Sequence, residues 1–173
     1  WDGKIAIEVQ LKKASDFEIK LRVPGWARNQ PMPGNLYKYL DKSDDRITLA
    51  INGAPINVDV QKGYIGIRRR WTAGDTIKLN LPMPVRRVIA HPKALADKGL
   101  VAIERGPIVY CAEFTDNDFD LSQLKLNDNS KLNVTFEPDF FSGVVTITSG
   151  KTKLIPYYLY SNRGRGWMRV WIP

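Results

Sequence analysis

Hydrophobic and polar residues alternate with a period of two along most of this chain. The alternation is regular over residues 5–11 and 17–23, and it resumes at 47–51 and 77–81. This period is typical of β-strands that bury one face, because successive side chains of a strand point to opposite sides. Helical spacing is not sustained anywhere, apart from a short helical turn that we expect around residues 36–40.

Turn-forming residues separate the alternating stretches at intervals of about 8–12 residues. The clearest signal is Asn52-Gly53, because both residues tolerate the positive φ of a two-residue hairpin turn. Pro24-Gly25 and Ala73-Gly74-Asp75 end other stretches in the same way. Many short strands joined by such turns predict an all-β fold, either an antiparallel β-sandwich or a barrel. The polar segment Thr115–Ser130 is the expected domain boundary.

The charge and the ends of the chain restrict the classes of partner. There are 26 Lys and Arg residues against 18 Asp and Glu residues, a net charge of +8. The charges are scattered, which favours a solvated surface over a nucleic-acid site, although Arg68-Arg69-Arg70 precedes Trp71 directly. No stretch approaches the roughly 20 apolar residues of a membrane span, so we expect neither nucleic acid nor membrane as a partner.

The first residues, Trp1-Asp2-Gly3, contain no initiating Met, and we interpret the chain as a piece of a longer protein. A targeting signal would then lie upstream. The cellular compartment is therefore not determined by the sequence, and a periplasmic or secreted bacterial parent is compatible with it.

Residues that could carry catalysis are few. Cys111 and His91 are the one cysteine and the one histidine, too few for a metal site, and Cys111 lies in an apolar run typical of a buried strand. A Cys–His catalytic pair is the less favoured alternative. Glu104 and Glu113 lie on neighbouring predicted strands, and a glycosidase needs two carboxylates roughly 5–9 Å apart. We favour a structural role for both, so no catalytic or metal-binding residue and no cofactor is assigned.

Aromatic residues gather at strand ends and near the C-terminus. Their rings can stack on sugars, or they can pack in the core and between domains. The candidates for a domain interface or a carbohydrate contact are Trp26, Trp71, Asn162, Arg163 and Trp167. Strand alternation places Trp167, Arg169 and Trp171 on one face, and Met168, Val170 and Ile172 on the face that we expect to be buried.

A series of short motifs resembles one known family in order and over essentially the whole chain. They are Leu21–Ala27, Ile51–Gly53, Gly63–Ile67 with Arg70-Trp71, Gly74–Thr76, Leu81–Arg86, Ala102–Cys111, Ile155–Tyr158, Asn162–Gly164 and Met168–Trp171. Each motif is weak alone, whereas the ordered set is specific. The chain resembles the C-terminal β-sandwich region of glycoside hydrolase family 127, the β-L-arabinofuranosidase-like enzymes.

The resemblance implies an upstream (α/α)6 catalytic barrel, in which zinc bound by Cys and Glu residues supports a Cys nucleophile. None of those residues can be carried over to this chain. It also implies two β-sandwich units, which we expect at 1–114 and 115–173, with the last strand returning to the first unit.

The roles implied are support of the barrel or formation of a homodimer, in a parent that acts on a plant-type glycan. An independent carbohydrate-binding module with exposed aromatic rings is the alternative, and a basic nucleic-acid-binding β-domain is the weakest reading.

Overall fold

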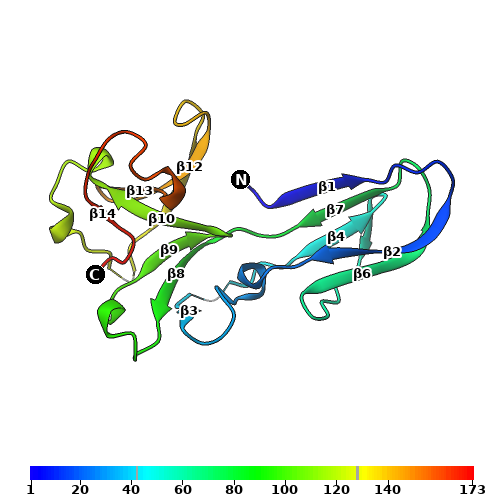
Figure 1. The fold of residues 1–173 in the computed structure, drawn as a ribbon, viewed down its shortest axis with the longest axis horizontal. Coiled ribbons are helices and arrows are strands. Elements are labelled where there is room, and N and C mark those ends of the chain that lie inside the picture. Colours follow the sequence, from blue (N-terminus) through cyan, green and yellow to red (C-terminus); the bar gives the residue numbers. More distant parts are fainter. Residues whose placement is uncertain (42, 128) are drawn as a thin grey trace. The chain divides into compact units, whose positions relative to one another are not determined.

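The computed structural model describes residues 1–41, 43–127 and 129–173, and within these ranges the chain is all-β (Figure 1). The strands are antiparallel, and short 3-10 turns are the only helical elements among the described residues. No helix there is long and apolar enough to cross a membrane. The predicted all-β, antiparallel, sandwich-like fold is confirmed. The chain forms two compact units, which we call the N-terminal unit (2–30 and 43–83) and the C-terminal unit (1, 31–41 and 84–173).

The N-terminal unit contains two antiparallel sheets (Figure 1). The first has the strand order β1 (Lys4–Glu8), β7 (Thr76–Asn80), β4 (Thr48–Ile51) and β5 (Ala54–Ile56). The second pairs β2 (Ser15–Arg22) with β6 (Tyr64–Trp71) along their whole length. The alternating apolar residues of both sheets meet in one core, whose fully or nearly fully buried members include Val23, Ile65, Trp71, Ile77 and Leu79.

The predicted hairpin turn at Asn52-Gly53 is confirmed. Ile51 pairs with Ala54, and the two residues between them have φ values of 50° and 81°. Asn52 also fastens the neighbouring turn, because its side chain donates to Asp75 Oδ1 at 2.7 Å and accepts from the Thr76 amide at 2.8 Å. Hydrogen bonds from Asn52 and from the Thr72 amide lower the pKa of Asp75 below its usual value.

Replacing Gly53 with valine should destabilise the N-terminal unit by about 1–2 kcal/mol, because a β-branched residue is strained at positive φ. No atom lies within 4 Å of the position that a Cβ would take, so backbone strain rather than a clash would cause the loss. Chemical denaturation measures the effect, and Gly53→Asn is the matched control because asparagine tolerates this conformation. An equal loss in both variants would contradict the assignment.

The C-terminal unit contains one large antiparallel sheet of eight strands. Its order is β11 (Asn133–Glu137), β12 (Val144–Ser149), β13 (Thr152–Pro156), β10 (Ile108–Glu113), β9 (Ala102–Arg105), β8 (Val85–Ala90) and β3 (Tyr37–Tyr39). The short strand β14 (Met168–Arg169) also pairs with β10.

Strand β10 is covered on both faces, which explains its continuous apolar sequence. Tyr110 and Ala112 belong to a core with Ile103, whereas Cys111 belongs to a separate core with Ile155. All of these side chains are at most 1% exposed. The strand ends at Glu113, which is equally buried, so its carboxylate must be satisfied within the protein.

Two local expectations differ from the structure. Residues 37–39 form strand β3 beside β8 rather than a helical turn, because their backbone pairs with 88–90. The compact units separate between Met83 and Pro84, not at the expected position between 114 and 115. The last strand was expected to return across that boundary, and β14 does pair with β10, within the C-terminal unit.

Candidate functional site

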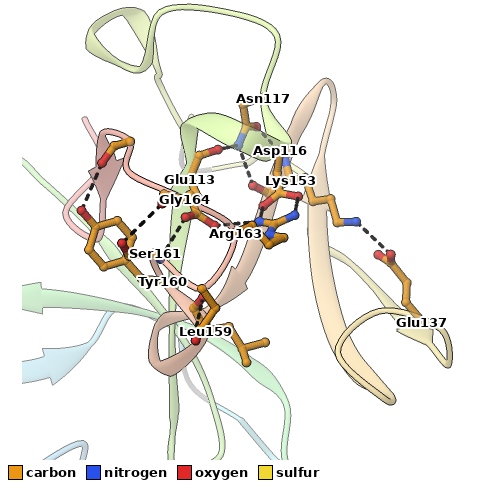
Figure 2. A network of polar contacts seen from close by, with 12 residues as sticks. Glu113, Asp116, Asn117, Glu137, Lys153, Leu159, Tyr160, Ser161, Arg163 and Gly164 are labelled. Carbon is orange, nitrogen blue, oxygen red and sulfur yellow. Dashed lines mark hydrogen bonds and ion pairs between the residues drawn. The ribbon is translucent and has the colours of Figure 1, made fainter.

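The buried carboxylate of Glu113 is the centre of a polar network at the end of β10 (Figure 2). Its side chain is 0% exposed and is contacted from a loop about fifty positions later in the chain. Arg163 Nη2 donates to Glu113 Oε2 at 2.7 Å, and the Ser161 amide donates to Oε1 at 3.0 Å. Both carboxylate oxygens are therefore occupied, and the contacts fix the loop against the strand.

Arg163 joins the network to a second carboxylate. Its Nη1 donates to Asp116 Oδ1 at 2.7 Å while Nη2 bonds Oδ2, so the guanidinium bridges two acids. The hydrogen bonds that Arg163 donates to Asp116 and Glu113 raise the pKa of its guanidinium above the usual value. The guanidinium also lies over two aromatic rings, 4.8 Å from the centroid of Phe140 and 5.5 Å from that of Phe141. This favours a permanently charged, well-ordered arginine.

Asn117 extends the network to the β12–β13 hairpin. Its amide donates to the carbonyl of Glu113 at 2.7 Å and to that of Lys153 at 3.1 Å, and its Oδ1 accepts from the Lys153 amide at 2.9 Å. Lys153 in turn pairs with Glu137 at 2.8 Å. Burial opposes ionisation of Glu137, but hydrogen bonds from Lys153 and Thr146 outweigh it and lower the pKa of that carboxyl. Three separate segments are thus tied together.

The loop that follows η5 (Tyr157–Leu159) carries the most exposed large side chain of this region. Trp167 is 83% exposed, and Phe114 beside it is 55% exposed. The Phe114 amide donates to the carbonyl of Trp167 at 3.0 Å, and the hydroxyl of Tyr160 donates to the carbonyl of Gly166 at 3.1 Å. The backbone around Trp167 is therefore fixed although its ring extends into solvent.

Two hollows adjoin Trp167 and Phe114. The larger has a volume of about 930 Å³ and includes Phe119, Leu121 and Met168 in its lining, with Asp118, Asp120 and Arg169 as its charged residues. The smaller has a volume of about 560 Å³ and is completed by Tyr160, Arg165 and Gly166. The two aromatic side chains therefore stand between two concave surfaces.

The five candidate contact residues fall into different environments. Trp167 and Arg163 come together in the loop just described, and Asn162 lies beside them with its amide donating to the carbonyl of Leu159 at 3.0 Å. Trp26 packs partly buried against the core of the N-terminal unit. Trp71 is 0% exposed and donates through Nε1 to the carbonyl of Phe17 at 3.2 Å, so its ring offers no face to a partner.

The alternation predicted for the last strand is clear at Trp167 and Ile172, whereas residues 168–171 are all partly buried. Met168 and Val170 pack against the core around Cys111, and Ile172 is 1% exposed. On the other face, Trp171 is half-buried with its ring 5.4 Å from that of Tyr37.

Glu104 and Glu113 do not form a catalytic pair. Glu104 pairs with Val109 on the neighbouring strand, and Val109 lies four positions before Glu113. At the usual rise of a strand, Glu104 and Glu113 are therefore about 13 Å apart along the sheet. Glu104 accepts from the hydroxyl of Tyr39 at 3.1 Å, and the guanidinium of Arg86 lies 3.9 Å from the ring centroid of Tyr39. Burial raises the pKa of Glu104, and the contacts with Tyr39 and Arg86 oppose that shift. Each carboxylate thus has its own structural partners.

The residues present do not fit the zinc that the family resemblance implies. No three His, Cys, Asp or Glu side chains gather at metal-binding distance in the part of the chain that the structure describes. Cys111 is completely buried, and burial raises the pKa of its thiol to about 12. His91 accepts from the Lys93 amide at 3.1 Å within a local turn. No catalytic step through zinc is therefore assigned to this chain.

Comparison with known families covers nearly every position. Residues 1–83 match the family description "Beta-L-arabinofuranosidase, GH127 middle domain", and residues 85–173 match "Glycoside hydrolase family 127 C-terminal domain". The chain belongs to glycoside hydrolase family 127. The junction of the two family domains coincides with the separation of the units at Met83 and Pro84, although residues 31–41 match the middle domain and belong to the C-terminal unit.

Individual relatives agree with this assignment. The non-reducing end β-L-arabinofuranosidase of Bifidobacterium longum subsp. longum is 31% identical over 98% of this chain and 28% of its own length. A GH127 β-arabinofuranosidase of known structure superposes with a TM-score of 0.94 at 39% identity, over 100% of this chain and 30% of that protein. The GH127 β-L-arabinofuranosidase of Geobacillus stearothermophilus T6 gives a TM-score of 0.84 at 36% identity, over 99% and 28%. The chain therefore spans less than a third of these relatives.

Sequence reasoning found Arg163 and Trp167 but missed the partners that make them a site. The sequence suggests Glu104 as the partner of Glu113, and it gives no signal for Asp116 or Phe114. The contacts of Arg163 with Glu113 and Asp116 span 50 and 47 positions, so no local spacing encodes them. The available signal was a charged residue at the end of an otherwise apolar run, which indicates a buried and therefore paired carboxylate.

Proposed function

We propose that this chain is the non-catalytic accessory β-sandwich region of a β-L-arabinofuranosidase-like glycoside hydrolase, where it supports the (α/α)6 catalytic barrel. The observation that carries the proposal is that the chain matches the middle and C-terminal domains of the family and spans 28–30% of its relatives. The separation of Glu104 and Glu113, each with its own partners, supports a structural role.

The isolated chain is expected to show no hydrolysis of an aryl β-L-arabinofuranoside, with or without added zinc. The physical reason is that Glu104 and Glu113 lie about 13 Å apart along the sheet, and each is held by its own partners. A spectrophotometric assay of the purified chain measures this, and the full-length parent enzyme is the positive control. Turnover that persists after repurification and disappears in Glu104→Gln or Glu113→Gln would contradict the proposal.

An independent carbohydrate-binding module is the second candidate function. The exposure of Trp167 favours it, because a solvent-facing indole can stack on a sugar ring. Affinity electrophoresis of the isolated chain in gels containing plant polysaccharides separates the two candidates. Retardation that is lost in Trp167→Ala but kept in Leu95→Ala, another highly exposed position, would favour the binding module.

A further inference from the structure

We propose that Trp167 and Phe114 form the contact through which this chain packs on the catalytic part of its own enzyme. The proposal rests on the accessory function proposed above and names the surface and the partner for it. Both residues lie in the C-terminal unit, and both border the two hollows described above.

The exposure of these side chains is unusual for a surface that meets only water. A Trp that is 83% exposed beside a Phe that is 55% exposed leaves two large aromatic side chains unburied at one place. Fully desolvated aromatic side chains dominate protein interfaces, and Trp is among the residues most enriched at their energetic centres. Charged residues lie around them, with Arg165 at one hollow and Asp118, Asp120 and Arg169 at the other. An aromatic centre with a charged rim is the composition of a protein contact.

The shape of the surface favours a protein as the binding partner over a sugar. A sugar platform offers one ring face together with polar side chains that bond the sugar hydroxyls. Here the two aromatic side chains project between two hollows, and the larger hollow combines Phe119, Leu121 and Met168 with the charged Asp118, Asp120 and Arg169. Such a ridge between concave surfaces fits interdigitating side chains, as in packed interfaces.

Hydrogen bonds within this chain hold the loop that carries Trp167. The Glu113 carboxylate holds Arg163 and the Ser161 amide, and the Phe114 amide holds the carbonyl of Trp167. Because the backbone is already fixed, little conformational entropy remains to be lost on docking. A preorganised aromatic contact suits a permanent interface within one protein.

The catalytic part of the parent is the occupant that the comparisons favour. The chain spans only 28–30% of its relatives, so the rest of each relative is more than twice as long as this region. A second copy of the chain and a glycan are the other occupants, and the experiment below separates all three.

Hydroxyl-radical footprinting with mass spectrometry tests the surface without any substitution. Trp167 is compared in this chain alone and in the full-length parent enzyme, whose mass in solution is measured in parallel. In the parent we expect Trp167 to be labelled about tenfold more slowly than in the chain alone, because interface tryptophans are fully desolvated. Leu95, which is 77% exposed and lies outside the surface, is the internal control and should be labelled equally in both.

Protection of Trp167 in a monomeric parent supports the proposal. Protection that appears only in a dimeric parent assigns the surface to a second copy and overturns it. Protection that appears only after an arabino-oligosaccharide is added assigns it to a glycan, and equal labelling in every sample also overturns it. Glycosidase activity of the chain alone would contradict the proposed function. That result is independent of the labelling of Trp167, so the two failures can be told apart.

A pair of variants gives an independent readout. Trp167→Ala should lower the melting temperature of the full-length enzyme but not that of this chain alone, where the ring contacts mainly solvent. Leu95→Ala should change neither. An unchanged melting temperature of the full-length Trp167→Ala enzyme would overturn the proposal, as would an equal fall in both proteins.

Discussion

Replacing Arg163 with alanine is expected to lower the free energy of unfolding of the C-terminal unit by about 3 kcal/mol. The substitution leaves Glu113, which is 0% exposed, without its counter-charge, and the loss of one partner of a buried pair typically costs about 3–5 kcal/mol. The lower end applies because the Arg163 side chain is 28% exposed, so water reaches part of it. Urea denaturation followed by circular dichroism measures the change.

Arg165→Ala is the matched control, because Arg165 lies two positions away on the same loop and is exposed. It takes part in none of the ion pairs formed by the described residues, and surface changes of this kind usually stay within about 0.5 kcal/mol. Equal effects of the two arginine variants would show that the Glu113 pair contributes nothing specific.

A double variant separates loss of the pair from burial of an unpaired charge. Glu113→Gln removes the buried charge, so adding it to Arg163→Ala should restore part of the lost stability. Additive losses in the double variant would mean that the two residues act independently, contrary to their 2.7 Å contact.

Much of the fold can be predicted from the sequence, because strand alternation and turn chemistry are local. The hairpin turn at Asn52-Gly53 could be predicted because it requires only that two adjacent residues tolerate positive φ, and both have positive φ in the structure. The ends of strands were less predictable. Met168–Arg169 is the whole of β14, although the alternation continues beyond it, because pairing with β10 ends there.

The expected boundary at 114 and 115 relied on composition, and composition was misleading for a physical reason. The segment Thr115–Ser130 is polar overall, yet Leu121, Leu124 and Leu126 are at most 5% exposed and belong to the core that contains Tyr110. Asn117 adds hydrogen bonds to Lys153. A few buried leucines in a polar segment are enough to attach it to a core, and average polarity does not reveal them.

The candidate site was only partly predictable, since burial depends on which strand face a residue occupies. Trp71 and Trp167 both follow a stretch that contains Arg and Gly, so their local sequences give no reason to expect different burial. In β6, however, Trp71 has the same parity as Ile65 and Ile67, which points it into the core. Trp167 directly precedes β14 and has the opposite parity to Met168 and Val170, which pack on the core, so its side chain points outward.

Truncation of the two tryptophans should therefore have very different effects on the stability of the isolated chain. Trp71→Ala is expected to lower the free energy of unfolding of the N-terminal unit by about 3–5 kcal/mol, because it leaves a cavity in the core and removes the hydrogen bond to the carbonyl of Phe17. Trp167→Ala should change stability by no more than about 0.5 kcal/mol, as expected for an exposed side chain. Trp71→Phe should fall between them, since it keeps an aromatic ring in the core but loses the Nε1 donor. Denaturant titration of the three variants measures these values, and a larger loss for Trp167→Ala than for Trp71→Ala would contradict the assignment of one ring to the core and the other to a partner.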